Sequence, residues 1–374
     1  MSTLQAPFKA DIVGSFLRPQ AIKDARAQFS AGAISAEKLK EVEDTCIAEL
    51  IEKQIAHGLH VITDGEYRRS YWHLDFMWGL QGVEHIELDH GYQFHDEETT
   101  HGSLKLTGKI GGKNHPFVEH FKFVKQFERP GVIARQTIPA PAQFYAELFR
   151  EENGKDTNKI YPNSDELILD IANAYRQVIK DLYDAGCRNL QFDDCTWGMV
   201  CDSKFWASMA GAGYDMKALQ ETYLKVNNLA LENRPEDLAV TTHVCRGNYH
   251  STWASEGAYD AVAETLFARE NVDAFYLEFD DYRSGGFKPL KLIPNGKKVV
   301  LGLITTKSPV LENKDAIVKR IREAATYIPL ERLHLSPQCG FASCEIGNKL
   351  TEKEEWDKIR LVQEIAHEVW GPDA

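Results

Sequence analysis

Short apolar runs alternate with amphipathic segments along most of the chain. The short runs are rich in β-branched and aromatic residues and are bounded by turn-forming residues, which predicts buried strands. Strands are predicted over residues 10–16, 60–66, 131–141, 189–195, 238–245, 274–281, 297–307 and 333–340. Helical segments separate nearly all of these runs, so we expect a parallel sheet built from strand–helix–strand units.

The amphipathic segments carry apolar residues at three-to-four spacing, as helices that bury one face do. Helices are predicted over residues 35–58, 165–186, 313–328 and 351–369. Gly58 is a helix stop, and Asn313 is a favoured N-cap. Eight strands alternating with helices favour an α/β fold of the (β/α)8 TIM barrel type, and a doubly wound open sheet is the alternative.

Residues 80–130 break this rhythm. They alternate aromatic and β-branched positions around glycine-rich turns, which predicts a hairpin-bearing insertion between the second and third strands. The sequence contains no low-complexity linker and no internal repeat. Residues 1–374 are therefore expected to form a single catalytic barrel that carries this insertion.

Composition and charge narrow the class of protein. The chain is 43% hydrophobic and 26% charged, which is typical of a globular protein. Its net charge of −13 argues against the basic face that nucleic-acid binding needs. No apolar run approaches the roughly 20 residues of a membrane span, and the N-terminus lacks the layout of a signal peptide. We expect a cytoplasmic enzyme with no nucleic-acid or membrane partner.

The cysteines do not resemble a disulfide framework. There are seven, an odd number, in a chain with no predicted secretion signal. Most are expected to be reduced and buried as small apolar side chains. Outside the candidate site described next, Cys195 is the thiol expected nearest the pocket.

In barrels of this type, functional residues lie at the C-terminal ends of the strands. The predicted strand ends carry many ionisable and thiol side chains: Gly14–Ser15, Asp64, Glu66, Asp193, Asp194, His243, Cys245, Glu278, Asp280, Lys307 and Cys339. His243 and Cys245 share one face of a strand because they are two residues apart. Glu278 and Cys339 follow at the ends of later strands, which gives four zinc-ligand types on one rim. The pattern alone leaves open a zinc site or ordinary buried strand ends.

Six motifs occur in order along the chain: "VGSF", "ITDGE", "QFDD", "HVC", "YLEFD" and "SPQCGF". Together they resemble the catalytic domain of cobalamin-independent methionine synthase, from about residue 10 to residue 370. The full-length synthases carry an additional N-terminal barrel, for which this chain is too short. The resemblance is therefore to the stand-alone catalytic-domain type, whose methyl donors vary.

The resemblance implies a zinc-dependent methyltransferase. In that family a (β/α)8 barrel holds Zn²⁺ with a His-x-Cys pair, a glutamate and a distant cysteine. These ligands fall here on His243, Cys245, Glu278 and Cys339. Zinc favours the thiolate form of a thiol, which is the nucleophile. The implied reaction converts a small thiol, homocysteine, to methionine with methyltetrahydrofolate or another methyl donor.

The resemblance also implies which residues bind the substrate. The main chain and hydroxyl of Gly14–Ser15 would meet the carboxylate of the amino acid. Glu66 and Asp193 would meet its ammonium group, and paired carboxylates do favour a cation. A structural rim of salt bridges is the alternative interpretation of these two acids.

One position departs from the family pattern. After the seventh strand the full-length synthases have "HSP", in which the histidine donates a proton, whereas this chain has "KSP" with Lys307. Lysine is a weak acid unless burial lowers its pKa. Lys307 and Asp194 are the candidate catalytic residues, and the identity of the methyl donor stays open. The end of the third strand, "TIPAPAQF", also differs from the family.

The loop after the second strand carries basic and aromatic residues. Arg68, Arg69, Tyr71, Trp72 and His73 follow directly on "DGE". This loop is expected either to hold the methyl donor or to pack against the insertion.

Two other functions are alternatives. One is a zinc-dependent thiol alkyltransferase that opens epoxides with coenzyme M, which has no ammonium group for Glu66 and Asp193 to bind. The other is a non-catalytic, zinc-stabilised binding barrel. A purely structural zinc has four permanent protein ligands and does not respond to thiols.

Overall fold

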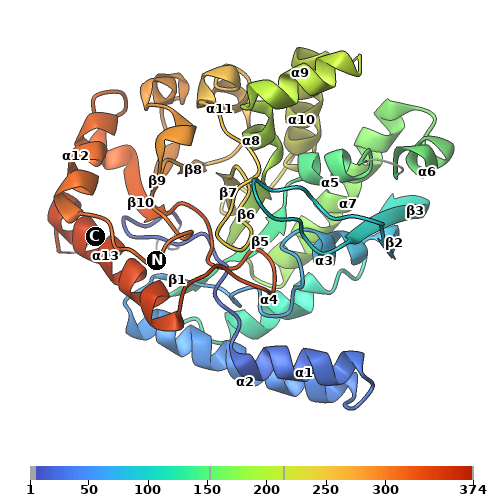
Figure 1. Cartoon of the computed structure of the whole chain (residues 1–374), viewed down its shortest axis with the longest axis horizontal. Coiled ribbons are helices and arrows are strands. Elements are labelled where there is room, and N and C mark those ends of the chain that lie inside the picture. The colour runs from blue at the N-terminus through green and yellow to red at the C-terminus, as the bar shows by residue number, and fades with distance from the viewer. Residues whose placement is uncertain (1–5, 151–152, 214, 373–374) are drawn as a thin grey trace.

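The computed structural model describes residues 6–150, 153–213 and 215–372 and forms a ring of parallel strands surrounded by helices (Figure 1). Six strands form one parallel sheet in the order β10–β9–β8–β7–β6–β5. Their bounds are β5 (Gln136–Pro139), β6 (Asn189–Asp194), β7 (Ala239–Val244), β8 (Ala274–Glu278), β9 (Lys298–Ile304) and β10 (Leu333–Pro337). Every residue of β5, β6, β7, β8 and β10 is buried, as expected for strands covered on both faces.

Three short segments close the ring. β1 (Val61–Ile62) pairs in parallel with β4 (Ile133–Ala134), and β4 continues into β5 through Arg135. On the other side, Ala10 pairs with Leu335 of β10, and the Phe16 amide donates to the Gly65 carbonyl at 3.1 Å. The chain therefore makes the eight positions of the predicted (β/α)8 TIM barrel, and the alternative of an open sheet is wrong.

The prediction of a regular strand over residues 10–16 is wrong, because only Ala10 makes a strand-type bridge. Side chains take the place of ladder hydrogen bonds there. The Arg135 guanidinium donates to the Ile12 carbonyl at 2.7 Å, and the Thr63 hydroxyl donates to the Gly14 carbonyl at 2.6 Å. Arg135 also forms a fully buried ion pair with Asp11 at 3.0 Å.

The four predicted helices are present as α2 (Ala36–Ala56), α7 (Ser164–Asp184), α12 (Lys314–Ala324) and α13 (Glu352–Trp370). Local capping sets where they begin. Asn313 caps α12 by accepting from the Ala316 amide at 3.0 Å, and Thr351 forms a capping box with Glu354 at the start of α13. These ends are encoded by residues next to them in the sequence.

Shorter helices complete the outer layer. The α-helices are α1 (Gln20–Ser30), α3 (Leu74–Trp78), α4 (Phe117–Lys125), α5 (Pro141–Glu147), α6 (Asn153–Ile160), α8 (Thr196–Val200), α9 (Ser203–Gly211), α10 (Met216–Ala230) and α11 (Leu266–Arg269). The 3₁₀-helices are η1 (Tyr259–Ala261), η2 (Tyr282–Ser284), η3 (Lys288–Leu292) and η4 (Leu330–Arg332). None of the helices in the described ranges combines the length and apolar character that a bilayer crossing needs.

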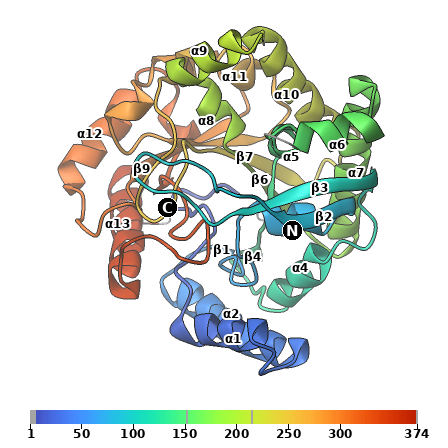
Figure 2. The same cartoon turned by 45° about the vertical axis from the view of Figure 1, so that its right-hand side comes forward.

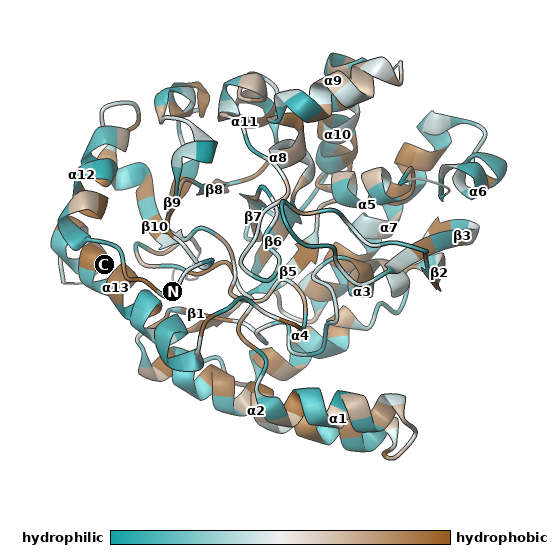
Figure 3. Cartoon of the chain, in the orientation of Figure 1, coloured by the Kyte–Doolittle hydropathy of each residue, from teal (hydrophilic) through white to brown (hydrophobic). Residues whose placement is uncertain are grey.

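The apolar residues lie where the helices meet the strands. Figure 3 shows apolar colour along the strands and polar colour on the outer turns of helices such as α2 and α13. On α7 the buried positions include Ile168, Ile171, Tyr175, Val178 and Leu182, which form one helical face. This packing fixes the strand ends that carry the candidate site.

The predicted insertion does contain a hairpin. β2 (Gln81–Glu87) and β3 (Gly102–Gly111) pair antiparallel. We call their connection, residues 88–101, the strap, because it crosses the barrel towards the loop after β7 (Figure 2). The strap is tied there by the His95 amide, which donates to the Trp253 carbonyl at 2.7 Å, and by Glu97, whose carboxylate pairs with His250 and Lys349 at 2.6 Å each.

Candidate active site

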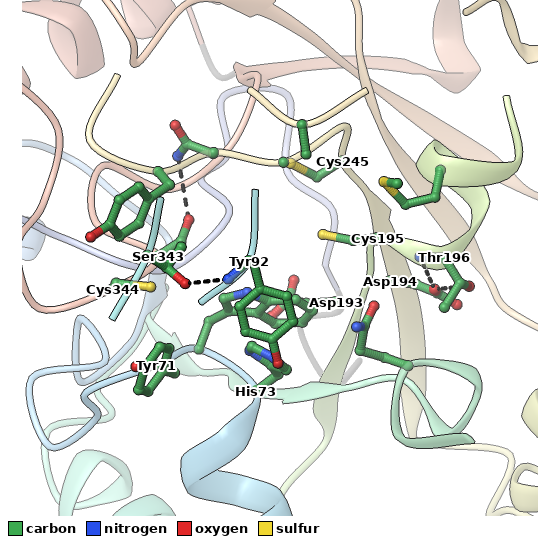
Figure 4. Close-up of a pocket in the computed structure, with 18 of the residues that line it drawn as sticks. Tyr71, His73, Tyr92, Asp193, Asp194, Cys195, Thr196, Cys245, Ser343 and Cys344 are labelled. Carbon is green, nitrogen blue, oxygen red and sulfur yellow. Dashed lines mark hydrogen bonds between the residues drawn. The ribbon is translucent and has the colours of Figure 1, made fainter. Parts of the chain in front are cut away.

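A cavity of about 480 Å³ lies at the C-terminal ends of the strands, beneath the strap. Its walls combine strand-end residues with aromatic residues from the strap and from the loop after β1. Figure 4 shows Cys195 and Cys245 on one side of this pocket, with Tyr71, His73 and Tyr92 across from them. The predicted strand-end residues Ser15, Glu66, Asp193, Asp194, His243, Cys245 and Cys339 all line it.

His243, Cys245 and Cys339 form a compact group of metal-ligand types. The possible ligand atoms of these three buried residues all lie within 4.8 Å of one another. The two sulfur atoms are 3.8 Å apart. β7 supplies His243 and, at its end, Cys245, while Cys339 follows β10, so the barrel brings together ligands that are far apart in sequence.

The environment of this group suits a cation. His243 is only 3% exposed, yet neither ring nitrogen meets the geometry of a hydrogen bond within the described residues. Interaction with the Cys195 thiol and burial raise the pKa of Cys245 well above its usual value. Interaction with Cys245 and burial do the same to the pKa of Cys339. A bound metal reverses this preference and favours the thiolates, so one imidazole and two thiols fit zinc.

Glu278 ends β8 but is not part of the three-residue group. One carboxylate oxygen accepts from the Arg246 amide at 2.7 Å, and the other accepts from the Arg283 guanidinium at 3.0 Å. The Lys307 ammonium lies 3.5 Å from that second oxygen. Burial acts to raise the pKa of Glu278, but the charges of Lys307, Arg246 and Arg283 outweigh it and lower the pKa.

Lys307 lies beside Glu278 and Asp280 and is not among the residues that line the cavity. Its ammonium pairs with Asp280 at 2.6 Å as well as with Glu278. Burial acts to lower the pKa of Lys307, but the charges of Asp280 and Glu278 outweigh it and raise the pKa. A lysine with a raised pKa holds its proton more firmly and is a poorer acid. These contacts give Lys307 a role in holding two carboxylates.

Glu66 and Asp193 face the cavity as a pair of acids. One Glu66 oxygen accepts from the Thr137 hydroxyl at 3.0 Å and pairs with Arg69 at 3.3 Å, while the other is buried without a hydrogen-bond partner in the described chain. Burial raises the pKa of Glu66, and burial together with the charge of Glu66 raises the pKa of Asp193 well above its usual value. The raised pKa values show that nearby positive charges do not fully offset the cost of ionising both acids.

The backbone around Glu66 is strained. Gly65 and Glu66 have φ values of +66° and +61°, and the left-handed region is costly for a glutamate. A hydrogen bond from the Glu66 amide to the Asp64 carboxylate, at 2.8 Å, supports this turn. The turn is what carries the Glu66 side chain into the cavity.

Gly14–Ser15 passes close to the same cavity. Gly14 has φ +145°, and a Cβ there would lie 3.0 Å from Thr137, so the close approach requires glycine. Ser15 lines the cavity, and its hydroxyl accepts from the Ala342 amide at 3.3 Å. The predicted carboxylate-binding residue therefore lies on the wall next to Cys339.

Asp194 points into a buried polar network. One oxygen accepts from the amide and the hydroxyl of Thr196, and the other accepts from the Asn227 side chain at 3.1 Å. The Asn227 amide group also donates to Glu270 at 2.9 Å. With both oxygens engaged, the geometry favours Asp194 as a support for α8 and α10, although it borders the cavity.

Several residues that line the cavity were not predicted from the sequence. Tyr92 and Phe94 come from the strap, and Glu147 and Arg150 come from the end of α5 and the residues after it. Their place depends on the path of the insertion, for which only the break in the strand–helix rhythm was a signal. In the loop after β1, Tyr71, Trp72 and His73 line the cavity, whereas Arg68 pairs with Glu43 and Asp44, and Arg69 with Glu66.

The fold and the site define an α/β barrel with a thiol- and imidazole-lined pocket at the C-terminal ends of its strands, as in barrel enzymes. The chain belongs to the family described as the cobalamin-independent synthase catalytic domain, whose model matches residues 8–92 and 160–367. The resemblance predicted from the motifs is thus confirmed.

Relatives of similar length support this assignment. The chain is 44% identical over 366 residues to the uncharacterised protein YxjG of Bacillus subtilis, covering 97% of this chain and 95% of the relative. A putative vitamin-B12-independent methionine synthase from Listeria monocytogenes has a solved structure with 39% identity and a TM-score of 0.77, covering 99% of this chain and 100% of that one. At 23% identity, a methionine synthase of Saccharolobus solfataricus matches 88% of this chain and 86% of its own length.

A more distant structure shares the fold. A B12-independent methionine synthase from Shewanella sp. W3-18-1, solved with selenomethionine, is 18% identical with a TM-score of 0.71 and covers 97% of this chain and 98% of that one. The family model leaves residues 93–159 of this chain unmatched. That segment contains part of the strap, Glu147 and Arg150, whereas Tyr71, His73 and Tyr92 lie within the matched residues.

Proposed function

We propose that the protein is a zinc-dependent methyltransferase that methylates the thiol of homocysteine to give methionine. The observation that carries this proposal is the buried group of His243, Cys245 and Cys339, which lies in the same cavity as the paired acids Glu66 and Asp193. One half of the cavity suits a thiol-binding metal, and the other suits an ammonium group. Homocysteine has both a thiol and an ammonium.

His243, Cys245 and Cys339 would hold the zinc. When bound, zinc acts as a Lewis acid that favours the thiolate form of the substrate at neutral pH. The predicted fourth ligand, Glu278, has each of its oxygens engaged by a hydrogen-bond donor. Three protein ligands leave a position for the substrate sulfur, which is the arrangement of catalytic rather than structural zinc sites.

The amino-acid end of the substrate is held by the opposite wall. The free oxygen of Glu66 and the carboxylate of Asp193 bind the ammonium group, and the Ser15 hydroxyl meets the carboxylate. These contacts direct the substrate sulfur towards His243, Cys245 and Cys339. The sulfur then attacks the methyl carbon, and the electron pair of the breaking bond stays with the donor.

The methyl donor occupies the aromatic side of the cavity. Tyr71, His73 and Tyr92 lie across from the thiols, and the His73 imidazole contacts the Tyr92 hydroxyl at 2.9 Å. Phe94, Glu147 and Arg150 belong to the segment that the family model does not match. The donor is therefore recognised both by residues within the match to the family model and by residues outside it.

The proposal is tested by supplying zinc-loaded protein with homocysteine and a panel of methyl donors, including methyltetrahydrofolate with one and with three glutamates. We expect methionine to form with one donor and to be absent with zinc-stripped protein. Calorimetry should show that homocysteine binds and that coenzyme M, which lacks an ammonium, binds at least tenfold more weakly. Failure of homocysteine to bind the zinc-loaded protein would contradict the proposal.

A further inference from the structure

Two buried asparagines join the loops that carry Cys245 and Cys339. Cys245 begins the loop after β7, and Asn248 follows it by three residues. Cys339 lies in the loop after β10, which Asn348 closes by donating its backbone amide to the Phe341 carbonyl at 3.0 Å. Asn248 and Asn348 are only 4% and 6% exposed. The Asn348 side-chain nitrogen donates to the Asn248 side-chain oxygen at 2.9 Å, which links two loops 100 residues apart in the sequence.

Asn248 also holds the residue that follows Cys339. Its side-chain nitrogen donates to the Gly340 carbonyl at 2.8 Å, and the Thr306 hydroxyl donates to the same carbonyl at 3.1 Å. On its other side Gly340 packs so closely against Ser15 that a Cβ at this position would overlap the serine hydroxyl. These contacts fix the backbone next to Cys339 from two directions.

Asn348 extends the connection to a third loop. Its side-chain nitrogen donates to the Thr306 carbonyl, just after β9, at 2.8 Å. Its side-chain oxygen accepts from the Ser251 amide at 2.8 Å. All the polar side-chain atoms of Asn248 and Asn348 therefore have partners, and a buried amide network in this state favours one arrangement of the chain. We call Asn248 and Asn348 the asparagine bridge.

The sheet does not set the separation of Cys245 and Cys339 directly. β8 and β9 stand between β7 and β10 in the strand order, so no ladder of backbone hydrogen bonds joins the two strands that precede these cysteines. Their sulfur atoms nevertheless lie 3.8 Å apart. The asparagine bridge crosses the same gap between the loops. Holding ligands together before a metal binds reduces the ordering that binding must otherwise impose on the chain.

We propose that the asparagine bridge sets the separation of Cys245 and Cys339 and thereby the affinity of this site for zinc. The inference rests on the proposed function, from which it takes the zinc site. Asn248 and Asn348 are positioning residues, because they act through the loops that carry the thiols. The contacts of Gly340 also keep the loop of Cys339 beside Ser15, so the bridge aligns the thiols with the proposed carboxylate-binding residue.

Zinc affinity, measured by competition with a chromogenic chelator, tests this inference. Asn248→Ala removes the bonds to Gly340 and Asn348, and we expect the zinc dissociation constant to rise about 10–100-fold. Asn189→Ala is the matched control. Asn189 is also a buried asparagine, which accepts from the Ala6 amide at 2.9 Å, but it begins β6 at the opposite end of the barrel. The control should keep the constant within about twofold of the wild type.

An unchanged zinc affinity in Asn248→Ala, or an equal loss in both variants, would overturn the inference and leave the proposed function intact. Absence of zinc binding by the wild type would overturn both. Because Asn248→Ala could misfold, hydrogen exchange of the native protein gives a second measurement. Added zinc should slow exchange of the Ser251 amide, which Asn348 binds, about threefold or more relative to the Ala6 amide. Equal slowing of the two amides would contradict a link between the bridge and the metal site.

Discussion

At the scale of single residues, the site depends on a pair of carboxylates held without enough positive charge. Within the described residues, one oxygen of Glu66 has no hydrogen-bond partner, and the Asp193 carboxylate accepts from the Gln191 side chain at 2.9 Å. A buried carboxylate in this state gains strongly from an ammonium partner. The backbone strain at Glu66 is a feature expected where function fixes a side chain.

Glu66→Gln should weaken homocysteine binding about 10–100-fold, because it removes a charged hydrogen bond worth about 1.5–3 kcal/mol. The dissociation constant for the zinc-loaded protein can be measured by calorimetry. Glu147→Gln changes a carboxylate on the opposite, aromatic wall and should leave this constant within about twofold. Equal losses of homocysteine affinity in both variants would mean that the acids act through the overall negative charge of the cavity. Glu66 would then not bind the ammonium group directly.

The raised pKa of Glu270 predicts that the free energy of unfolding depends on pH. Glu270 lies outside the group of His243, Cys245 and Cys339. Burial, followed by the charge of Asp194, raises its pKa from 4.5 to about 8. The folded state therefore holds a proton that the unfolded state loses above about pH 4.5, so this group stabilises the fold at low pH and its contribution falls as pH rises towards 8. A shift of this size corresponds to at most about 5 kcal/mol.

Glu270→Gln should remove this dependence. Denaturant unfolding at pH 5 and pH 9 should show a smaller loss of stability for the variant than for the wild type. Glu264→Gln, at an exposed position in the same segment, should keep the wild-type slope. If Glu270→Gln and the wild type lose stability in parallel, Glu270 is ionised in the folded protein.

At the scale of elements, the path of the strap is the feature that the sequence predicts least well. The long helices were predictable because their periodicity and caps are local, as at Asn313 and Thr351. The segment over residues 10–16 is not a regular strand because the Arg135 and Thr63 side chains bond its carbonyl groups, and no local sequence pattern indicates such contacts. The strap's path over the pocket likewise depends on contacts with residues about 150 or more positions later in the chain.

Glu97→Gln should loosen the strap without unfolding the protein. The carboxylate contacts His250 and pairs with Lys349 at partly exposed positions, where solvent screening keeps such contacts weak. We expect hydrogen exchange at the His95 and Thr99 amides to become a few times faster. Glu87→Gln alters an exposed ion pair on β2 and should not change these rates. Unchanged exchange in Glu97→Gln would show that the contacts of Glu97 with His250 and Lys349 do not restrain the strap.

At the scale of the whole molecule, the apolar core extends through all of the barrel strands. The main apolar cluster extends from Ala6 to Val369 and includes residues of every barrel strand. His243, Cys245 and Cys339 lie at one rim and are not part of this cluster, so we expect the core to form without a metal. The sequence could predict that His243, Cys245 and Cys339 lie together because they stand at or just after the ends of regular strands. It could not predict that Glu278 contacts Arg246 and Arg283, because loops without a recognisable pattern supply these partners.

Cys339→Ser should lose zinc while the barrel stays folded. Its far-UV circular dichroism should match the wild type, and it should unfold cooperatively within about 3 °C of zinc-stripped wild type, because bound metal adds stability only to protein that retains the site. Zinc content is measured by elemental analysis. Global unfolding of Cys339→Ser would indicate that the metal is structural.

The central claim is that the substrate's chalcogen atom binds the metal held by His243, Cys245 and Cys339. Selenohomocysteine tests it most directly, because selenium is distinguishable from every sulfur of the protein in X-ray absorption. With zinc-loaded protein and saturating selenohomocysteine, we predict a selenium neighbour at the zinc edge and a zinc neighbour at the selenium edge. Spectra that show zinc bound only by protein atoms, with no selenium neighbour, would contradict the account.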